Sequence, residues 1–187
     1  MLLSCIAYAV IPVYTLLFVS GTNWFTSNLS VIGSLPTRRA AFFLLGVIIG
    51  LYYYEALKKL LVYLPHPILE HRLLVTALLL LLLAVTTPYL PESVPLQAFL
   101  HVVFAFVSSV LLALCLYLIL WRLSALSPDA RQFLRPFRLS MVAITLVSGL
   151  LLILAGIISS ALEVFFIIAT TILVQRLYVL PSCIFSR

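Results

Sequence analysis

The chain is a succession of long apolar stretches separated by short polar segments. Six of these stretches reach the ~20-residue length that carries a helix across a bilayer. They lie near residues 2–20, 39–61, 69–87, 97–121, 139–158 and 161–180. A transmembrane barrel would instead show ~10-residue segments of alternating polarity. The pattern therefore predicts an all-α fold: an integral membrane bundle of six transmembrane helices, forming one domain over residues 1–187.

The segment between the first two runs, TNWFTSNLSVIGS at 22–34, is polar but carries no charged side chain. Three of its apolar residues recur at the spacing of one helical face: Phe25, Leu29 and Ile32. With Thr22 as N-cap, the pattern predicts a short interfacial helix of about three turns. We expect it to lie on the outer surface or to fold over the mouth of the bundle as a lid.

Composition supports a membrane environment. Hydrophobic residues make up 65 % of the 187 residues, charged residues 9 %, and the mean hydropathy is +1.28. Soluble domains are roughly half apolar and about a quarter charged. The net charge of +6 would suggest nucleic acid in a soluble protein, but here the basic residues flank apolar runs. We therefore expect a lipid environment and no nucleic-acid partner.

The placement of Lys and Arg predicts the orientation of the helices. Nine basic residues fall on one side of the predicted bundle: Lys58, Lys59, Arg72, Arg122, Arg131, Arg135, Arg138, Arg176 and Arg187. Only Arg38 and Arg39 fall on the other side. Basic loops stay in the cytoplasm. Both termini are therefore expected in the cytoplasm of a plasma membrane protein, in the inner membrane of a bacterium, with 22–34 facing outward.

Small residues recur at steps of four or seven residues in several runs, so that they share one helical face and let membrane helices approach closely. Such rows comprise Gly46 with Gly50; Ala105, Ser109 and Ala113; and Gly149, Gly156 and Ser160. They predict interior or interhelical faces. Two helix starts are also legible: Ser127 before Pro128, and a capping box of Ser160 with Glu163.

His101 and Glu163 are the strongest candidates for a site. Each falls in the first turn of a predicted helix on the outer side, and His101 heads the row that begins at Ala105. An ionisable group on an inward face of a membrane bundle is a functional hypothesis by default. The alternatives are an interfacial histidine bonded to a carbonyl, and a Glu163 that only caps its helix.

Two residues of the outer segment, Asn28 and Trp24, are expected to join these two as ligand-binding residues on the outer face. PHPILEHR at 65–72 combines two histidines and a glutamate, but its spacing matches no established zinc motif. No motif of a soluble-type catalytic site occurs either. We therefore expect no metal, no cofactor and no catalytic residue.

Three stretches resemble a group of uncharacterised bacterial six-helix membrane proteins: TNWFTSNLSVIG, TTPYLPESVPLQAFLHVVFAF and GIISSALEVFF. The first outer loop of that group has the form N-x-S-x-x-G, matched here by Asn28, Ser30 and Gly33. The group is distantly similar to the Frag/DRAM/Sfk superfamily. Eukaryotic members of that superfamily are linked to lipid-anchor remodelling, autophagy and plasma-membrane lipid organisation. The resemblance implies an architecture and transfers no catalytic residue.

The leading interpretation is a non-enzymatic multi-pass protein that binds a membrane lipid or small amphiphile in an outward-facing pocket. One alternative is a small transporter or channel subunit, which needs a polar path through the bundle. The other is an intramembrane lipid-modifying enzyme with His101 and Glu163 as acid and base, which must then lie within reach of one another. A homo-oligomer or a larger membrane complex fits each of these.

Overall fold

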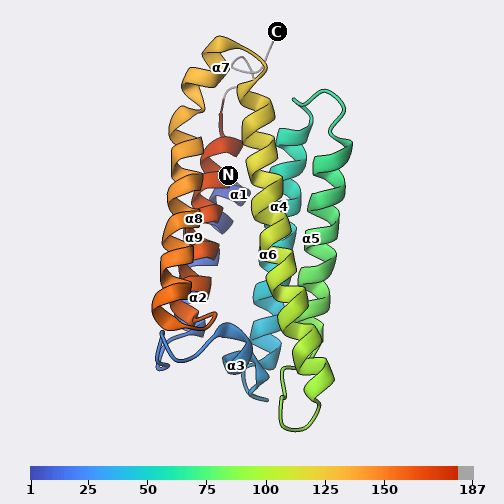
Figure 1. Cartoon of the computed structure of the whole chain (residues 1–187), viewed down its shortest axis with the longest axis vertical. Coiled ribbons are helices and arrows are strands. Elements are labelled where there is room, and N and C mark those ends of the chain that lie inside the picture. The colour runs from blue at the N-terminus through green and yellow to red at the C-terminus, as the bar shows by residue number, and fades with distance from the viewer. Residues whose placement is uncertain (181–187) are drawn as a thin grey trace.

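The computed structural model describes residues 1–180, and every regular element in this part of the chain is a helix (Figure 1). Five helical segments are long and apolar enough to cross a membrane. They are α4 (Arg39–Leu61), α5 (Ile68–Thr86), α6 (Pro95–Ser124), α8 (Arg135–Ala155) with the short α7 (Pro128–Phe133) before it, and α9 (Ser160–Tyr178). The predicted all-α membrane bundle is confirmed, with bounds close to those expected.

The first helix is shorter than the others. It consists of α1 (Leu2–Cys5), a π-helical turn η1 (Ile6–Val10) and α2 (Ile11–Phe18), which follow one another without a break. The wider turn ends two residues before Pro12, which lacks the amide hydrogen that a regular helix would use. Gln175 of α9 donates a hydrogen bond to Ser4 Oγ at 3.0 Å, so this helix is docked in the bundle.

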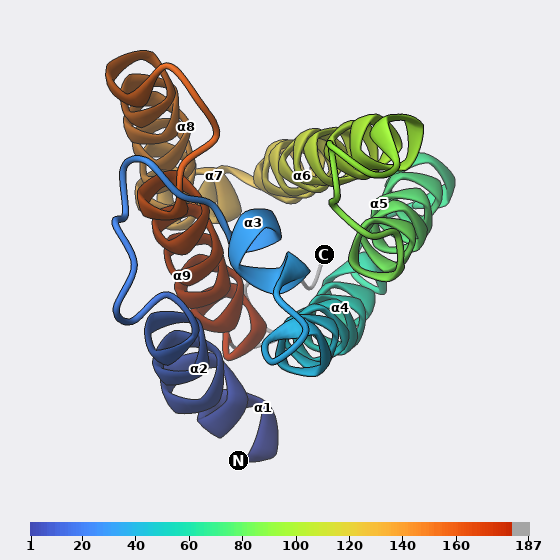
Figure 2. The ribbon, with the colours of Figure 1, turned by 90° about the horizontal axis from the view of Figure 1, so that it is seen from below.

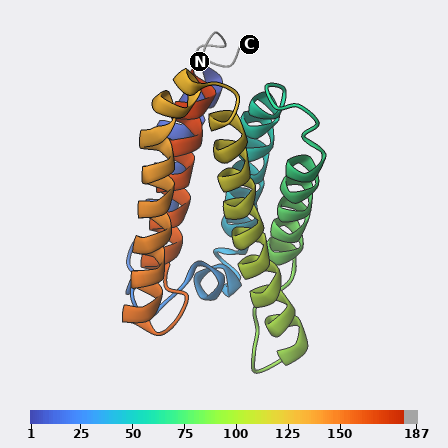
Figure 3. The ribbon, with the colours of Figure 1, turned by 45° about the horizontal axis from the view of Figure 1, so that its top comes forward.

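The long helices form an arc in the order α6, α5, α4, α9 and α8, and α2 packs against both α4 and α9 (Figure 2). α6 and α8 form the two ends of the arc and stand apart from one another at the α3 end (Figure 2). In the half nearer α7 they are joined by the Tyr117 hydroxyl, which lies 3.0 Å from Thr145 Oγ1. The first helix begins and α9 ends at the end opposite α3 (Leu29–Ser34) (Figure 3).

Buried tyrosines join the two halves of the arc. Tyr53 of α4 lies 2.5 Å from Thr170 Oγ1 of α9, and its neighbour Tyr52 donates to the Thr171 carbonyl at 3.1 Å. All of these side chains are at most 1 % exposed. A hydrogen bond between membrane helices contributes about 1 kcal/mol, so this cluster holds α4 to α9.

Two predicted helix ends differ in outcome. Ser127 Oγ accepts from the Ala130 amide at 3.0 Å and caps α7, as expected. The row of Gly149, Gly156 and Ser160 predicts that Gly156 lies inside a helix, and that prediction is wrong. Gly156 adopts a left-handed conformation with φ +68° and terminates α8, so the run predicted to reach residue 158 stops at Ala155.

The outer helix exists but is shorter than predicted. α3 begins at Leu29 with Asn28 as its N-cap and has six residues. Thr22 caps nothing, because its hydroxyl donates back to the Val19 carbonyl. α3 lies over the inside of the arc, beside α9 and α4 (Figure 2). Leu29 and Ile32 are buried as expected, whereas Phe25 lies outside the helix and is 56 % exposed.

Candidate functional site

A cavity of about 400 Å³ lies within the arc, bounded at one end by α3. Its walls come from α3, α4, α5, α6, α8 and α9 and are mainly aliphatic and aromatic. Ligand sites typically measure about 300–1,000 Å³. The cavity is open between α6 and α8, where the lining residues Phe106, Val110 and Leu152 are 51 %, 48 % and 38 % exposed. In a membrane this opening faces the lipid.

Small side chains create much of this space. The α6 row of Ala105, Ser109 and Ala113 lines the cavity rather than a helix contact. Gly149 of α8 also lines it, and a Cβ added there would meet nothing within 4 Å. Gly46 is different, because a Cβ there would lie 2.5 Å from Val85 of α5, so it permits close helix packing. The rows of small residues therefore face the inside of the bundle as predicted, but they mainly line a cavity instead of a helix contact.

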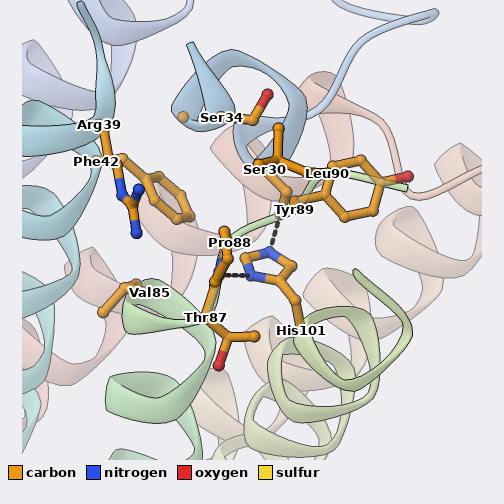
Figure 4. A pocket seen from close by; sticks show the side chains of 11 residues that line it. Ser30, Ser34, Arg39, Phe42, Val85, Thr87, Pro88, Tyr89, Leu90 and His101 are labelled. Atoms are coloured by element: carbon orange, nitrogen blue, oxygen red, sulfur yellow. Dashed lines mark hydrogen bonds between the residues drawn. The ribbon is translucent and has the colours of Figure 1, made fainter. Parts of the chain in front are cut away.

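His101 is 1 % exposed and lies in α6 at the α3 end of the cavity (Figure 4). Its Nδ1 lies 2.9 Å from the Thr87 carbonyl and its Nε2 lies 2.6 Å from Ser30 Oγ. A carbonyl oxygen only accepts, so Nδ1 carries the proton in this bond. In the neutral ring Nε2 then accepts from the Ser30 hydroxyl. The inward orientation predicted for His101 is confirmed by its position.

Glu163 does not form the predicted capping box. Ser159, not Ser160, is the N-cap of α9, and its Oγ accepts from the Leu162 amide at 3.4 Å. Glu163 Oε2 accepts instead from the Leu29 amide at 2.7 Å, which is the first amide of α3. Glu163 therefore caps a different helix from the one predicted, and it also lines the cavity.

The outer segment in turn caps the start of α9. The carbonyls of Ser27 and Trp24 accept from the Ser160 and Ala161 amides, at 2.7 and 2.9 Å. These are amides at the start of α9 that have no partner within their own helix. The outer segment and α9 thus cap one another, which fixes α3 over the cavity.

Of the four predicted ligand-binding residues, the structure brings two into one cavity. His101 and Glu163 both line it, although no hydrogen bond joins them in the described part of the chain. Asn28 and Trp24 do not line it. Asn28 Oδ1 accepts from the Val31 amide at 2.8 Å, so this side chain is used as a helix cap.

Glu70 of PHPILEHR belongs to a structural contact at the other end of the bundle. Glu70 is fully buried, and its Oε1 pairs with Arg122 Nη1 of α6 at 2.6 Å. Arg122 also donates to the carbonyls of Pro65 and His66. No group of three or more His, Cys, Asp or Glu side chains that could hold a metal occurs within residues 1–180.

Sequence reasoning missed two cavity hydroxyls. Ser148 Oγ of α8 lines the cavity, is buried and has no hydrogen-bond partner in the described residues. Ser30 contacts His101, and the N-x-S-x-x-G pattern contained the signal. Asn28 caps α3, Ser30 bonds His101, and Gly33 admits the ring of Phe42, since a Cβ on Gly33 would lie 2.5 Å from Phe42 Cγ.

We compared the chain with protein-family models, with curated proteins and with solved structures, and none matches it. The resemblance to bacterial six-helix proteins and to the Frag/DRAM/Sfk superfamily therefore stays a prediction from the sequence.

Proposed function

We propose that this multi-pass membrane protein binds a membrane lipid or another amphiphile in the cavity under α3. The observation that carries the proposal is the cavity itself, which is about 400 Å³ in volume, mainly apolar, and open between α6 and α8. An acyl chain can enter such an opening from the bilayer without passing through water.

The distribution of polar groups supports an amphiphile over a purely apolar ligand. Ser30, His101 and Glu163 gather at the end that α3 bounds. Deeper in the cavity Ser109 and Thr145 donate back to carbonyls of their own helices, so their hydroxyl hydrogens are used, and only the buried Ser148 hydroxyl lacks a partner among the lining hydroxyls of the described residues. A ligand with its polar head under α3 and its apolar part along α6 and α8 matches this order.

The depth of the cavity favours binding over passage across the membrane. Along α4, α8 and α9 its lining extends as far as Tyr53, Thr145 and Ile167. The bonds Tyr53–Thr170 and Tyr117–Thr145 lie at or beyond that level and join the helices. A transporter or channel would need a polar continuation toward the end where α7 lies.

The orientation follows from charge. Lys58, Lys59 and the arginines of α7 and the start of α8 lie at the end opposite α3. By the positive-inside rule that end and both termini are cytoplasmic, with α3 and the cavity mouth outward in a plasma membrane such as a bacterial inner membrane. Arg187 of the predicted basic set lies outside the described residues.

Filling the cavity tests the proposal. Gly149→Leu places a large side chain where a Cβ meets no neighbour, so the variant is expected to fold and to exclude ligand. Native mass spectrometry of protein extracted gently from membranes should show bound lipid on the wild type and at least tenfold less on Gly149→Leu.

Ala143→Leu is the matched control, since Ala143 lies on α8, is exposed and does not line the cavity. It should retain lipid as the wild type does. Equal lipid retention by Gly149→Leu and Ala143→Leu would refute binding in this cavity.

A further inference from the structure

We propose that Ser30 and His101 form a serine–histidine pair that cleaves the ester of a bound acyl lipid, an inference that rests on the proposed lipid binding and extends it to chemistry. An activated serine needs a base within about 2.6–3.2 Å and a third group that orients the base. Ser30 Oγ lies 2.6 Å from Nε2, and the Thr87 carbonyl holds Nδ1 at 2.9 Å (Figure 4).

The tautomer set by this arrangement is the one the reaction requires. Because the Thr87 carbonyl fixes the proton on Nδ1, Nε2 presents its lone pair to the Ser30 hydroxyl. The ring is held in place by neighbours on both sides, with centroid distances of 6.2 Å to Phe42 and 5.6 Å to Tyr89. His101 is thus positioned as a general base before any ligand arrives.

The pair lies where two cavities meet. Ser30, Phe42, Val85 and His101 line both the 400 Å³ cavity and a smaller outer pocket of about 30 Å³. Arg39, the first residue of α4, lines the outer pocket and not the large cavity (Figure 4). An acyl chain in the large cavity would bring its ester to Ser30, with an anionic headgroup toward Arg39. The geometry therefore points to an acylated glycerophospholipid.

The reaction balances with water as the second substrate. Ser30 Oγ attacks the ester carbonyl carbon, and its proton passes to His101 Nε2. The tetrahedral intermediate breaks its bond to the glycerol oxygen, which takes that proton, and the lysophospholipid leaves as an alcohol. The acyl group stays on Ser30 until water attacks it, again through His101. Fatty acid is then released, and the Ser30 hydroxyl is restored.

Other serines nearby lack a base. Ser34, also on α3 and also lining the outer pocket, donates to the Val31 carbonyl at 2.7 Å. Ser109 in the large cavity donates to the Ala105 carbonyl at 3.0 Å. If the pair is reactive, Ser30 should therefore react in preference to Ser34 and Ser109.

A long-chain alkyl fluorophosphonate tests the inference, because an activated serine displaces fluoride from phosphorus and remains covalently labelled. Full-length protein in lipid nanodiscs should be labelled at Ser30, located by peptide mass spectrometry. Ser30→Ala should lose the label. Ser93→Ala should keep it, because Ser93 is exposed in the loop before α6 and lines neither cavity. His101→Gln places an amide near Nε2 that can bond to Ser30 but cannot take its proton, so labelling should slow roughly 100-fold or more.

Lipid retention is measured on the same preparations by native mass spectrometry. Wild-type protein that carries lipid but is not labelled at Ser30 overturns the inference and leaves the proposed binding intact. Labelling of His101→Gln at the wild-type rate overturns it as well, since Ser30 would then react without its base. Protein that retains no lipid refutes the proposed function, whatever the labelling.

Discussion

The Glu163 carboxylate of α9 accepts a hydrogen bond from the Leu29 amide at 2.7 Å, across 134 positions of the chain. It supplies the first amide of α3 with a partner that α3 lacks within its own six residues. The start of α9 depends in turn on the carbonyls of Trp24 and Ser27. The piece of chain that bounds the cavity is therefore held by the same helix that forms one of the cavity walls.

Removing this carboxylate should loosen α3. Glu163→Ala leaves the Leu29 amide without its partner, which we expect to lower the free energy of local opening by about 1–3 kcal/mol. Amide hydrogen exchange of residues 29–34, followed by mass spectrometry in detergent, should accelerate accordingly. Glu163→Gln keeps an oxygen acceptor at the same reach and should stay closer to the wild type. Unchanged exchange in Glu163→Ala would show that the bond does not hold α3.

The contact between α4 and α5 should be sensitive to one methyl group. Gly46→Ala puts a Cβ 2.5 Å from Val85 Cγ1, and overpacking of this kind costs about 1–3 kcal/mol. The thermal unfolding midpoint in detergent should fall. Gly50→Ala is the control, because its nearest neighbour, Leu81, lies 3.8 Å away.

Adding Val85→Ala to Gly46→Ala should recover part of the lost stability, since the effects of substitutions at residues in direct contact are not additive. If Gly46→Ala and Gly50→Ala unfold at the same temperature, the close approach at Gly46 does not constrain the helices.

The orientation can be tested with single cysteines. In a background with the native cysteines replaced by serine, Thr26→Cys lies in the exposed outer loop and Asp129→Cys in the exposed first turn of α7. A membrane-impermeant maleimide added to intact cells should label Thr26→Cys and not Asp129→Cys. Breaking the cells should make both reactive. The reverse pattern would place both termini outside and overturn the charge-based orientation.

The helices of the bundle were predictable because their cause is local. A run of about 20 apolar residues has to form a helix in hydrocarbon, where each backbone group needs a partner within the segment. Helix ends were predictable only where the cap is also local. The prediction for Ser127 is confirmed. The predicted Ser160–Glu163 box is wrong, because Ser159 is the N-cap of α9 and the Glu163 carboxylate accepts from an amide of another helix.

The outer segment shows the same limit. Its periodicity predicted a helix from Thr22, and the structure begins α3 only at Leu29. The carbonyls of Trp24 and Ser27 are committed to α9, so the residues before α3 do not continue its hydrogen-bond pattern. Local propensity favoured a longer helix, and a tertiary contact determined its start.

For the candidate site, the sequence alone determined which residues were chemically capable and on which faces of their helices they stand. It placed His101 on an inward face and both His101 and Glu163 at the outer end, and both line the cavity. Only the tertiary structure brought Ser30 to His101, 71 positions away, and kept the small residues of α6 and α8 from closing on one another. Helix formation in a membrane is decided within one segment, whereas a cavity and a side-chain pair depend on how separate helices pack.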